Sequence, residues 1–247
     1  MRLRVFAFVA AFLASVAPLS ANPAFTPTAE NESLTFYVYV YGLKMGLLQV
    51  GISQNEDQYA AKGRVATTGL VDKISRFHFD GEVHGSKDGT RYWPDTYSAT
   101  IVKRQSEDAV RMRYDNRTPV VMAYLPQRAP RADDVDPSKQ RGAVDLISSA
   151  YMVLRDAPKE EICGKSIQMY DGRRRSQIKL EPPKFQDGKA SCTGFYERLA
   201  GFSMGEMAKQ TVFPFTFDYE MQKDGSYRLM RVSTDTTIGP AHLVRKD

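Results

Sequence analysis

The fold class of this chain is decided by the segment LTFYVYVY at residues 34–41. Aliphatic residues and Phe alternate there with Thr and Tyr, and successive side chains of a β-strand point to opposite faces of a sheet. The segment therefore predicts a strand with an apolar face and a tyrosine face. The apolar face consists of Leu34, Phe36, Val38 and Val40.

Turn signals follow this strand at short intervals. Residues 42–46 contain two glycines and predict a turn into a second strand over 47–54. Four Asp-Gly pairs come later, and Asp-Gly supplies the positive φ that tight hairpins require. Strands separated by such turns predict an antiparallel meander, because parallel strands need a connecting helix of about a dozen residues. The Asp-Gly pairs begin at Asp88, Asp171, Asp187 and Asp224, and the further strands are expected over 76–84, 90–103, 109–115, 119–125, 166–170, 174–180, 189–198, 212–222 and 227–236.

One stretch, residues 145–155, predicts a helix. Asp145 can cap its start, and its apolar residues fall near one face at helical spacing. The preceding residues 126–142 are rich in Pro, Arg and Asp and predict a long exposed loop. We expect a single domain over 34–247, since neither half of the strands could cover its apolar face alone. The predicted fold is mainly β, with a large curved antiparallel sheet or partly open β-barrel and one amphipathic helix packed on it.

The start of the chain predicts export. Residues 1–21 have a charged start, a short apolar centre and small residues at the exit, which is the pattern of a secretory signal peptide, and we expect cleavage after Ala21. The apolar run is shorter than the ~20 residues that a spanning helix needs, and no later segment approaches that length. Residues 22–33 predict a flexible lead-in. The mature protein is expected to be soluble, with no membrane span.

The two cysteines, Cys163 and Cys192, both lie in the part expected to be exported. An even number of thiols in an oxidising compartment favours a structural disulfide. Metal binding is the alternative, but two thiols and three histidines do not have ligand spacing, and the cysteines are far from the C-x-x-C spacing of a redox pair. We therefore expect a disulfide, no metal and no cofactor.

The charge balance excludes nucleic-acid binding. The chain carries a net charge of +5, and loss of Arg2 and Arg4 with the leader would leave +3. A nucleic-acid partner requires basic residues gathered in one footprint, whereas here they are spread among acids. The one dense run, residues 173–175, follows a turn and is expected to be a solvated strand end, with binding of an anion as the alternative.

Other polar groups give no specific signal. The acids within residues 133–136 fall in the predicted loop, where solvent would keep them ordinary, and they lack the glycine and distal Glu of a calcium loop. His78 and His84 are six residues apart, which places both on the same face of a strand. We expect them to be ordinary polar sheet positions.

The segment GFSMG at residues 201–205 matches the nucleophile-elbow pattern of serine hydrolases, and His242 follows it in hydrolase order. The elbow requires a parallel strand that enters a sharp turn before a helix. The residues ahead of 201 predict hairpins instead, so a hydrolase that uses Ser203 and His242 is the less favoured alternative.

Aromatic alternation recurs at residues 213–219. Core packing explains such faces, but a curved sheet with more apolar lining than its helix can fill would leave a cavity for a lipid or another apolar ligand. The candidate lining residues come from two strand faces and the helix: Phe36, Val38, Val40, Phe213, Phe215, Phe217, Leu146 and Ala150.

Two segments, YVYGLKMG at 39–46 and AVDLISSA at 143–150, carry a family resemblance together with the leader. The chain resembles the domain-of-unknown-function 3108 family of exported bacterial proteins over residues 34 to about 236. The most specific piece consists of Val144, Asp145 and Ser148. The resemblance implies a periplasmic, predominantly antiparallel β protein. Because the family has no assigned catalytic residues, no functional position is carried over.

The expected function is non-enzymatic. The protein would bind an apolar or lipid-like envelope component, or an envelope protein, on its curved sheet. One alternative is a structural envelope protein with a filled core and no ligand. The sequence leaves the ligand, the partner and the oligomeric state open.

Overall fold

The computed structural model describes residues 30–236 and 239–246. The predicted signal peptide at 1–21 and the first part of the predicted lead-in lie outside the described residues. The first strand, β1, spans Glu30–Val40, so order begins earlier than the predicted Leu34. The reason is that residues 30–33 pair with the end of the second strand in the same ladder as the residues that follow.

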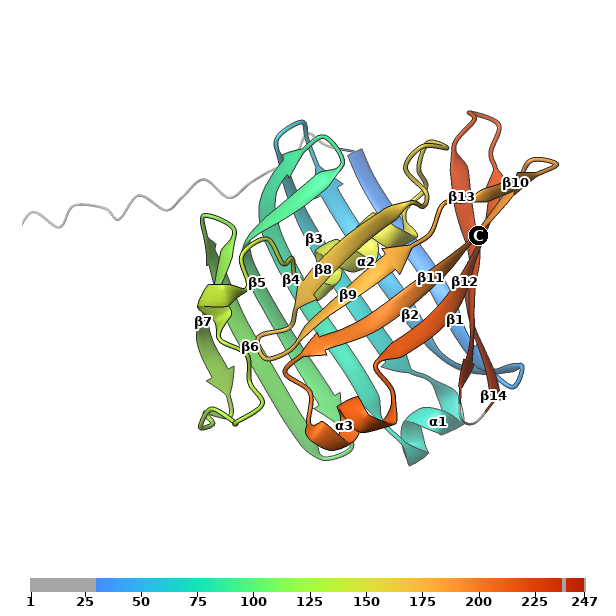
Figure 1. Ribbon diagram of the computed structural model, residues 1–247. Coiled ribbons are helices and arrows are strands. Elements are labelled where there is room, and N and C mark those ends of the chain that lie inside the picture. The colour runs from blue at the N-terminus through green and yellow to red at the C-terminus, as the bar shows by residue number, and fades with distance from the viewer. Residues whose placement is uncertain (1–29, 237–238, 247) are drawn as a thin grey trace, which may run out of the picture.

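The strands of the described residues form one 14-stranded sheet (Figure 1). All ladders between named strands are antiparallel, and the order is β7-β6-β5-β4-β3-β2-β1-β14-β13-β12-β11-β9-β8, with β10 paired to β11. The two halves of the chain thus form two meanders that join where β1 pairs with β14. The further strands are β2 (Leu43–Gln54), β3 (Gln58–Thr67), β4 (Phe77–Asp88), β5 (Arg91–Lys103), β6 (Ser106–Asp115), β7 (Thr118–Leu125), β8 (Lys165–Tyr170), β9 (Arg175–Leu180), β10 (Lys184–Gln186), β11 (Lys189–Ala200), β12 (Val212–Met221), β13 (Tyr227–Thr236) and β14 (Gly239–Arg245).

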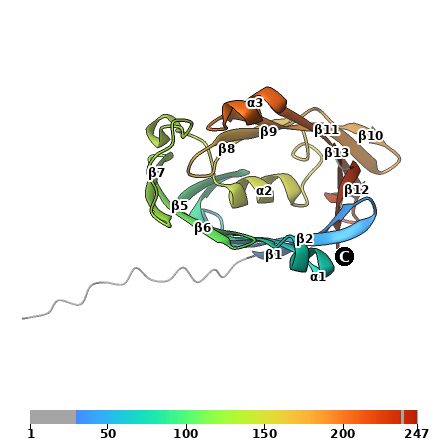
Figure 2. The ribbon, with the colours of Figure 1, turned by 90° about the horizontal axis from the view of Figure 1, so that it is seen from below.

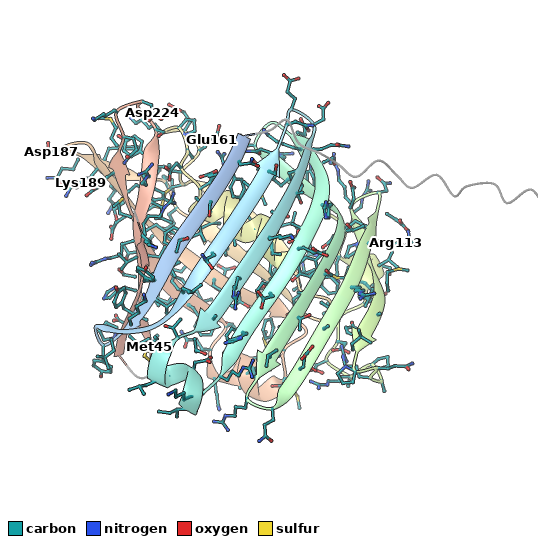
Figure 3. The ribbon with its side chains drawn as sticks, turned by 180° about the vertical axis from the view of Figure 1, so that it is seen from behind. Met45, Arg113, Glu161, Asp187, Lys189 and Asp224 are labelled. Carbon is teal, nitrogen blue, oxygen red and sulfur yellow. A yellow bond between two sulfur atoms is a disulfide. The ribbon has the colours of Figure 1, made fainter. Side chains whose placement is uncertain are left out.

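The sheet curls around one helix, α2 (Leu146–Leu154), which lies inside the curve (Figure 2). The two edge strands, β7 and β8, do not pair with each other, so the barrel stays open along one seam. This confirms the predicted fold class of a curved antiparallel sheet, or partly open barrel, with a helix against its concave face. Figure 3 shows the outer face of β1–β6, with Arg113 on β6 and Met45 beside the short helix α1 (Gly69–Ile74).

The four Asp-Gly pairs all turn one strand into the next. They connect β4 to β5, β8 to β9, β10 to β11 and β12 to β13. Each glycine has a positive φ, between 58° and 97°, which is the conformation that tight hairpins demand. Local turn chemistry therefore sets the strand ends as the sequence predicts.

Two well-formed strands, β3 and β14, were not expected from the sequence patterns. Strand β3 reads QYAAKGRVAT, and its inward positions include Ala61 and Gly63. Small residues give a weak strand signal, because strand propensity reflects packing of branched and aromatic side chains. The short β10, α1 and α3 (Met204–Lys209) were also not expected.

Helix α2 follows the prediction closely in its bounds, with Asp145 as N-cap and Arg155 as C-cap. It is not the one-sided amphipathic helix that the sequence suggests, because strands surround it. The buried residues occupy most of its circumference: Ile147, Ser148, Ser149, Tyr151, Val153 and Leu154.

The loop at 126–142 covers the open seam. It contains one 3-10 turn, η1 (Pro137–Lys139). The Asp134 carboxylate accepts hydrogen bonds from Arg128 at 2.7 Å and from Arg173 at 2.8 Å. Burial opposes ionisation of Asp134, but these hydrogen bonds outweigh it and hold the pKa well below its ordinary value. The expectation that solvent keeps this carboxyl ordinary is wrong, since the loop docks on the β8–β9 turn.

The basic run at 173–175 is likewise not a solvated strand end. Each of its side chains contacts another segment: Arg173 pairs with Asp134, Arg174 lies over the ring of Phe202 at 5.1 Å, and Arg175 donates to Gln140 Oε1 at 2.8 Å. The run therefore helps to attach the seam loop to the sheet.

A disulfide joins Cys163 and Cys192, as predicted, with a sequence separation of 29. Cys163 follows α2, and Cys192 lies on β11. Both side chains are buried. The bond therefore ties the connection that leaves the central helix to the sheet.

Candidate ligand-binding site

The start of α2 is fixed by Asp145, which is fully buried. Its Oδ1 accepts the backbone N–H groups of Ile147 at 2.8 Å and Ser148 at 3.0 Å, and its Oδ2 accepts the Ser148 hydroxyl at 2.5 Å. The Ser148 hydroxyl also lies 2.6 Å from the hydroxyl of Tyr59 on β3. Burial raises the pKa of Asp145, although the hydrogen bonds favour its ionised form. These bonds thus fix the start of α2 relative to β3 inside the barrel.

Small residues on the sheet let α2 approach closely. Gly63 on β3 and Gly81 on β4 are register partners. A Cβ at either position would lie 3.0 Å from the Ile147 side chain, tighter than most real Cβ contacts. A larger residue there would require the Ile147 side chain or the helix to shift. The same small residues that weaken the sequence signal of β3 therefore place the helix.

A polar aromatic cluster fills the interior near the later turns of α2. Tyr92 packs edge-to-face on both Tyr59 and Tyr151, with ring centroids 5.0 and 5.3 Å apart. The Tyr151 hydroxyl donates to Glu32 at 2.6 Å, and the Tyr92 hydroxyl donates to Gln54 at 2.7 Å. Burial raises the pKa of all three tyrosines, which keeps them neutral donors. These side chains satisfy one another's hydrogen bonds, so this part of the interior is packed.

An apolar cavity of about 330 Å³ lies beside the first turns of α2. Phe77 lines the cavity and begins β4, and two residues separate it from the end of α1, so the cavity lies toward the end of the barrel that carries α1 (Figure 1). Its volume is at the lower end of the range of ligand pockets, about 300–1,000 Å³. Its apolar lining comes from β2–β5 and the helix: Leu48, Val65, Phe77, Phe79, Ile101, Leu146, Ile147 and Ala150.

A second cavity, of about 300 Å³, adjoins the apolar one. Both are lined by Phe79, Ile101, Lys103 and Leu146. The second cavity extends to the covered seam, where Arg128 and Arg173 also line it. An apolar cavity and a basic cavity thus share part of one wall.

A cavity of about 500 Å³ lies near the other end of α2, at the start of β8. Three of the charged groups that line it already have partners. Arg155 pairs with Glu161, and the Lys165 ammonium donates to the carbonyl oxygens of Met152 at 2.8 Å and Glu161 at 2.6 Å. Burial lowers the pKa of Lys165 to about 8. This charged lining suits an apolar ligand poorly.

The structure divides the predicted lining residues between the cavity and the core. Leu146 and Ala150 line the apolar cavity. Phe36 and Phe217 are 0% and 5% exposed and belong to the main core cluster, and Phe215 packs against that cluster. The remaining three predicted positions are half-buried: Val38, Val40 and Phe213.

The sequence analysis missed the lining contributed by β2–β5. Leu48 and Val65 are register partners, as are Val65 and Phe79, and Phe79 and Ile101. They form one cross-strand row beneath the helix. Alternation along each strand could have identified the inward faces, but not which part of each face the helix leaves uncovered.

Ser203 and His242 do not have the arrangement that a serine hydrolase requires. Ser203 is the N-cap of α3, and its hydroxyl is hydrogen-bonded to Glu206 Oε2 at 2.9 Å. His242 lies on β14, where its Nδ1 is 3.0 Å from the Ser233 hydroxyl. The strand before Ser203, β11, is antiparallel to both of its long neighbours, so the parallel strand of a nucleophile elbow is missing here.

The two strand histidines lie on the outward face of β4. His78 Nε2 is 2.8 Å from Asp72 of α1, and His84 is exposed. Over residues 30–236 and 239–246, no group of three or more His, Cys, Asp or Glu side chains could hold a metal ion. The same residues contain no helix that is long and apolar enough to cross a membrane.

Fold and interior together define a class: a curled, open antiparallel β-barrel that encloses one helix and an apolar cavity. The chain belongs to the family described as Protein of unknown function (DUF3108), whose model matches residues 35–187, as the sequence resemblance predicts. No curated protein matches the chain. Among solved structures, it is similar to the beta-barrel-like protein of domain of unknown function DUF1849 from Brucella abortus. The identity is 10% and the TM-score 0.44, over 90% of this chain and 97% of that chain.

Proposed function

We propose that this protein is a non-enzymatic, periplasmic carrier or binder of an apolar or lipid-like ligand. The observation that carries the proposal is the apolar cavity between the first turns of α2 and the inner faces of β2–β5. Covering the apolar wall of such a cavity with an apolar molecule is favourable, by about 25 cal/mol per Å² of surface removed from water. The buried disulfide supports an oxidising compartment, where such bonds persist.

A purely structural role with a filled core fits the interior less well. The core is filled around Tyr59 and Tyr151, which are buried and linked by ring contacts and hydrogen bonds. It is not filled beside Leu146 and Ala150. A protein that needed only a stable scaffold would gain from larger side chains there, since voids in cores are destabilising.

Native mass spectrometry of the protein purified gently from its natural source tests the proposal first. Organic extraction then identifies any bound molecule. A reproducible apolar adduct supports the carrier function and gives its ligand class. A clean apo mass, together with no binding of the neutral fluorophore N-phenyl-1-naphthylamine, would overturn it.

Variants locate the bound probe. Ala150→Phe places a ring in the apolar cavity and should weaken fluorophore binding at least tenfold. Thr96→Phe adds the same ring to the exposed outer face of β5 and should leave binding unchanged. Equal affinity for both variants would place the fluorophore elsewhere and contradict the assigned site.

A further inference from the structure

We propose that the ligand is an anionic amphiphile, with its alkyl chain in the apolar cavity and its acidic head group in the adjoining basic cavity. This inference rests on the proposed function and adds the chemical class of the ligand. It follows from two neighbouring cavities of opposite character that share Phe79, Ile101 and Leu146 in their walls. A molecule that occupies both must have an apolar part and a polar part.

The basic cavity carries an excess of positive charge. Five cationic side chains line it against two carboxylates, Asp108 and Asp171. Asp171 Oδ1 is already used by two backbone N–H groups of its own turn, at 2.9 and 2.7 Å. The cationic side chains are Lys103, Arg128, Arg131, Arg173 and Arg174.

Three of these cations are held by the protein itself. Arg128 and Arg173 share the carboxylate of Asp134, and Arg174 lies over the ring of Phe202 and 3.9 Å from Glu206. With these two carboxylates counted, the three guanidinium groups still give the cavity a fixed wall of net positive charge. A wall of this kind attracts an anion without having to rearrange, which is the condition for strong electrostatic binding.

The other two cations are available to a ligand. Within the described residues, the side chains of Lys103 and Arg131 make no hydrogen bond or ion pair, including with Asp108. Lys103 is the more informative of the two, because it lines both cavities. An ammonium at this junction would meet a head group attached to a chain that enters the apolar cavity.

Competition between head groups on one chain length tests the inference. Laurate, dodecyl phosphate, 1-dodecanol and dodecyltrimethylammonium, each below its micellar concentration, compete with bound N-phenyl-1-naphthylamine, which is neutral. We expect laurate and dodecyl phosphate to displace the fluorophore at concentrations at least tenfold lower than dodecanol, and the cationic amphiphile to be the weakest. The stronger of the two anions identifies the head group as a carboxylate or a phosphate.

A charge-matched pair of variants separates specific from general attraction. Lys103→Gln with Arg131→Gln should remove most of the advantage of the anions and leave the affinity for dodecanol unchanged. Lys62→Gln with Arg111→Gln removes the same charge from exposed outer positions on β3 and β6 and should retain the advantage. Equal displacement by all four head groups would overturn the anionic class alone. Absence of fluorophore binding or of displacement by any of them would overturn the proposed function itself.

Discussion

Asp145 shows how one residue sets the position of the central helix. It lies in the segment that carries the family resemblance, and its role in the structure is to cap α2 from a fully buried position. The cap also reaches β3, because Ser148 bonds both to Asp145 and to Tyr59. The structure therefore gives this residue a role in placing the helix.

Replacing Asp145 should destabilise the protein by an amount that depends on whether the new side chain can still cap α2. We expect Asp145→Ala to lower the free energy of unfolding by about 1–2 kcal/mol, because two helix N–H groups lose their acceptor. Asp145→Asn should cost less, since its side-chain oxygen can still accept and no charge is buried. Urea unfolding measures both. The control is Ser203→Ala, which removes the exposed N-cap of α3; a loss at Asp145 no larger than at Ser203 would contradict the buried cap.

At the scale of elements, the distance between α2 and the sheet is set by glycine. Gly63 and Gly81 lie under Ile147, so the helix backbone sits close to β3 and β4. This close approach separates the interior into the packed tyrosine end and the apolar cavity. The size of the cavity is therefore a consequence of where the helix rests.

A double-mutant cycle tests whether Gly63 and Ile147 constrain each other. Gly63→Ala should lower the free energy of unfolding by about 1–3 kcal/mol, because its methyl group would meet Ile147 at 3.0 Å. Ile147→Ala alone should cost about 2–5 kcal/mol through the space it leaves, and it should cost less when Ala occupies position 63. Gly51→Ala is the control, since a Cβ there meets no atom within 4 Å. Purely additive effects would show that the two residues do not constrain each other.

At the scale of the whole molecule, the open seam of the barrel is covered by the loop at 126–142, because the edge strands β7 and β8 do not pair. The loop at 126–142 bridges the open seam through Asp134 and its two arginines. The backbone N–H of Val135 also donates to the carbonyl of Arg173 at 3.0 Å.

The ion pairs of the seam predict a pH-dependent contribution to stability. The folded protein holds the pKa of Asp134 below its unfolded value, so the contribution is present at neutral pH and is lost as the pH falls below about 4. At pH 7, Asp134→Asn should lower the free energy of unfolding by about 2–3 kcal/mol, and the difference from wild type should shrink at pH 3. Asp133→Asn is the control, because that side chain has no partner within the described residues. A difference that stays constant with pH would contradict the ion-pair assignment.

The disulfide gives a second prediction at this scale. Cys163→Ala with Cys192→Ala should lower the free energy of unfolding by about 3–4 kcal/mol, since the bond restricts the unfolded chain. A reductant should shift the urea midpoint of wild type toward that of the variant, and it should not affect the variant. Identical midpoints for wild type and variant would show that the bond adds no stability.

Much of the fold could be predicted from local patterns. Alternation in 34–41, the four Asp-Gly turns and the cap at Asp145 each act over a few residues, so the strands, the hairpins and the helix could be assigned without a structure. Strand β3 was not predicted because its inward positions include the small residues Ala61 and Gly63, which give a weak strand signal. Gly63 lies against Ile147, so the reason for a small residue there is a helix distant in the sequence.

What the sequence by itself determined is the mainly β class, the central helix, the disulfide and the family. What only the tertiary structure decided is which inward residues pack against α2 and which line a cavity. Leu146 and Phe36 both belong to apolar faces, yet only Leu146 borders unfilled space. The seam depends on tertiary structure for the same reason, because Asp134 meets Arg173 across 39 residues of chain. Local periodicity specifies the face to which a side chain points, whereas the curvature of the sheet and the depth of the helix specify what it meets there.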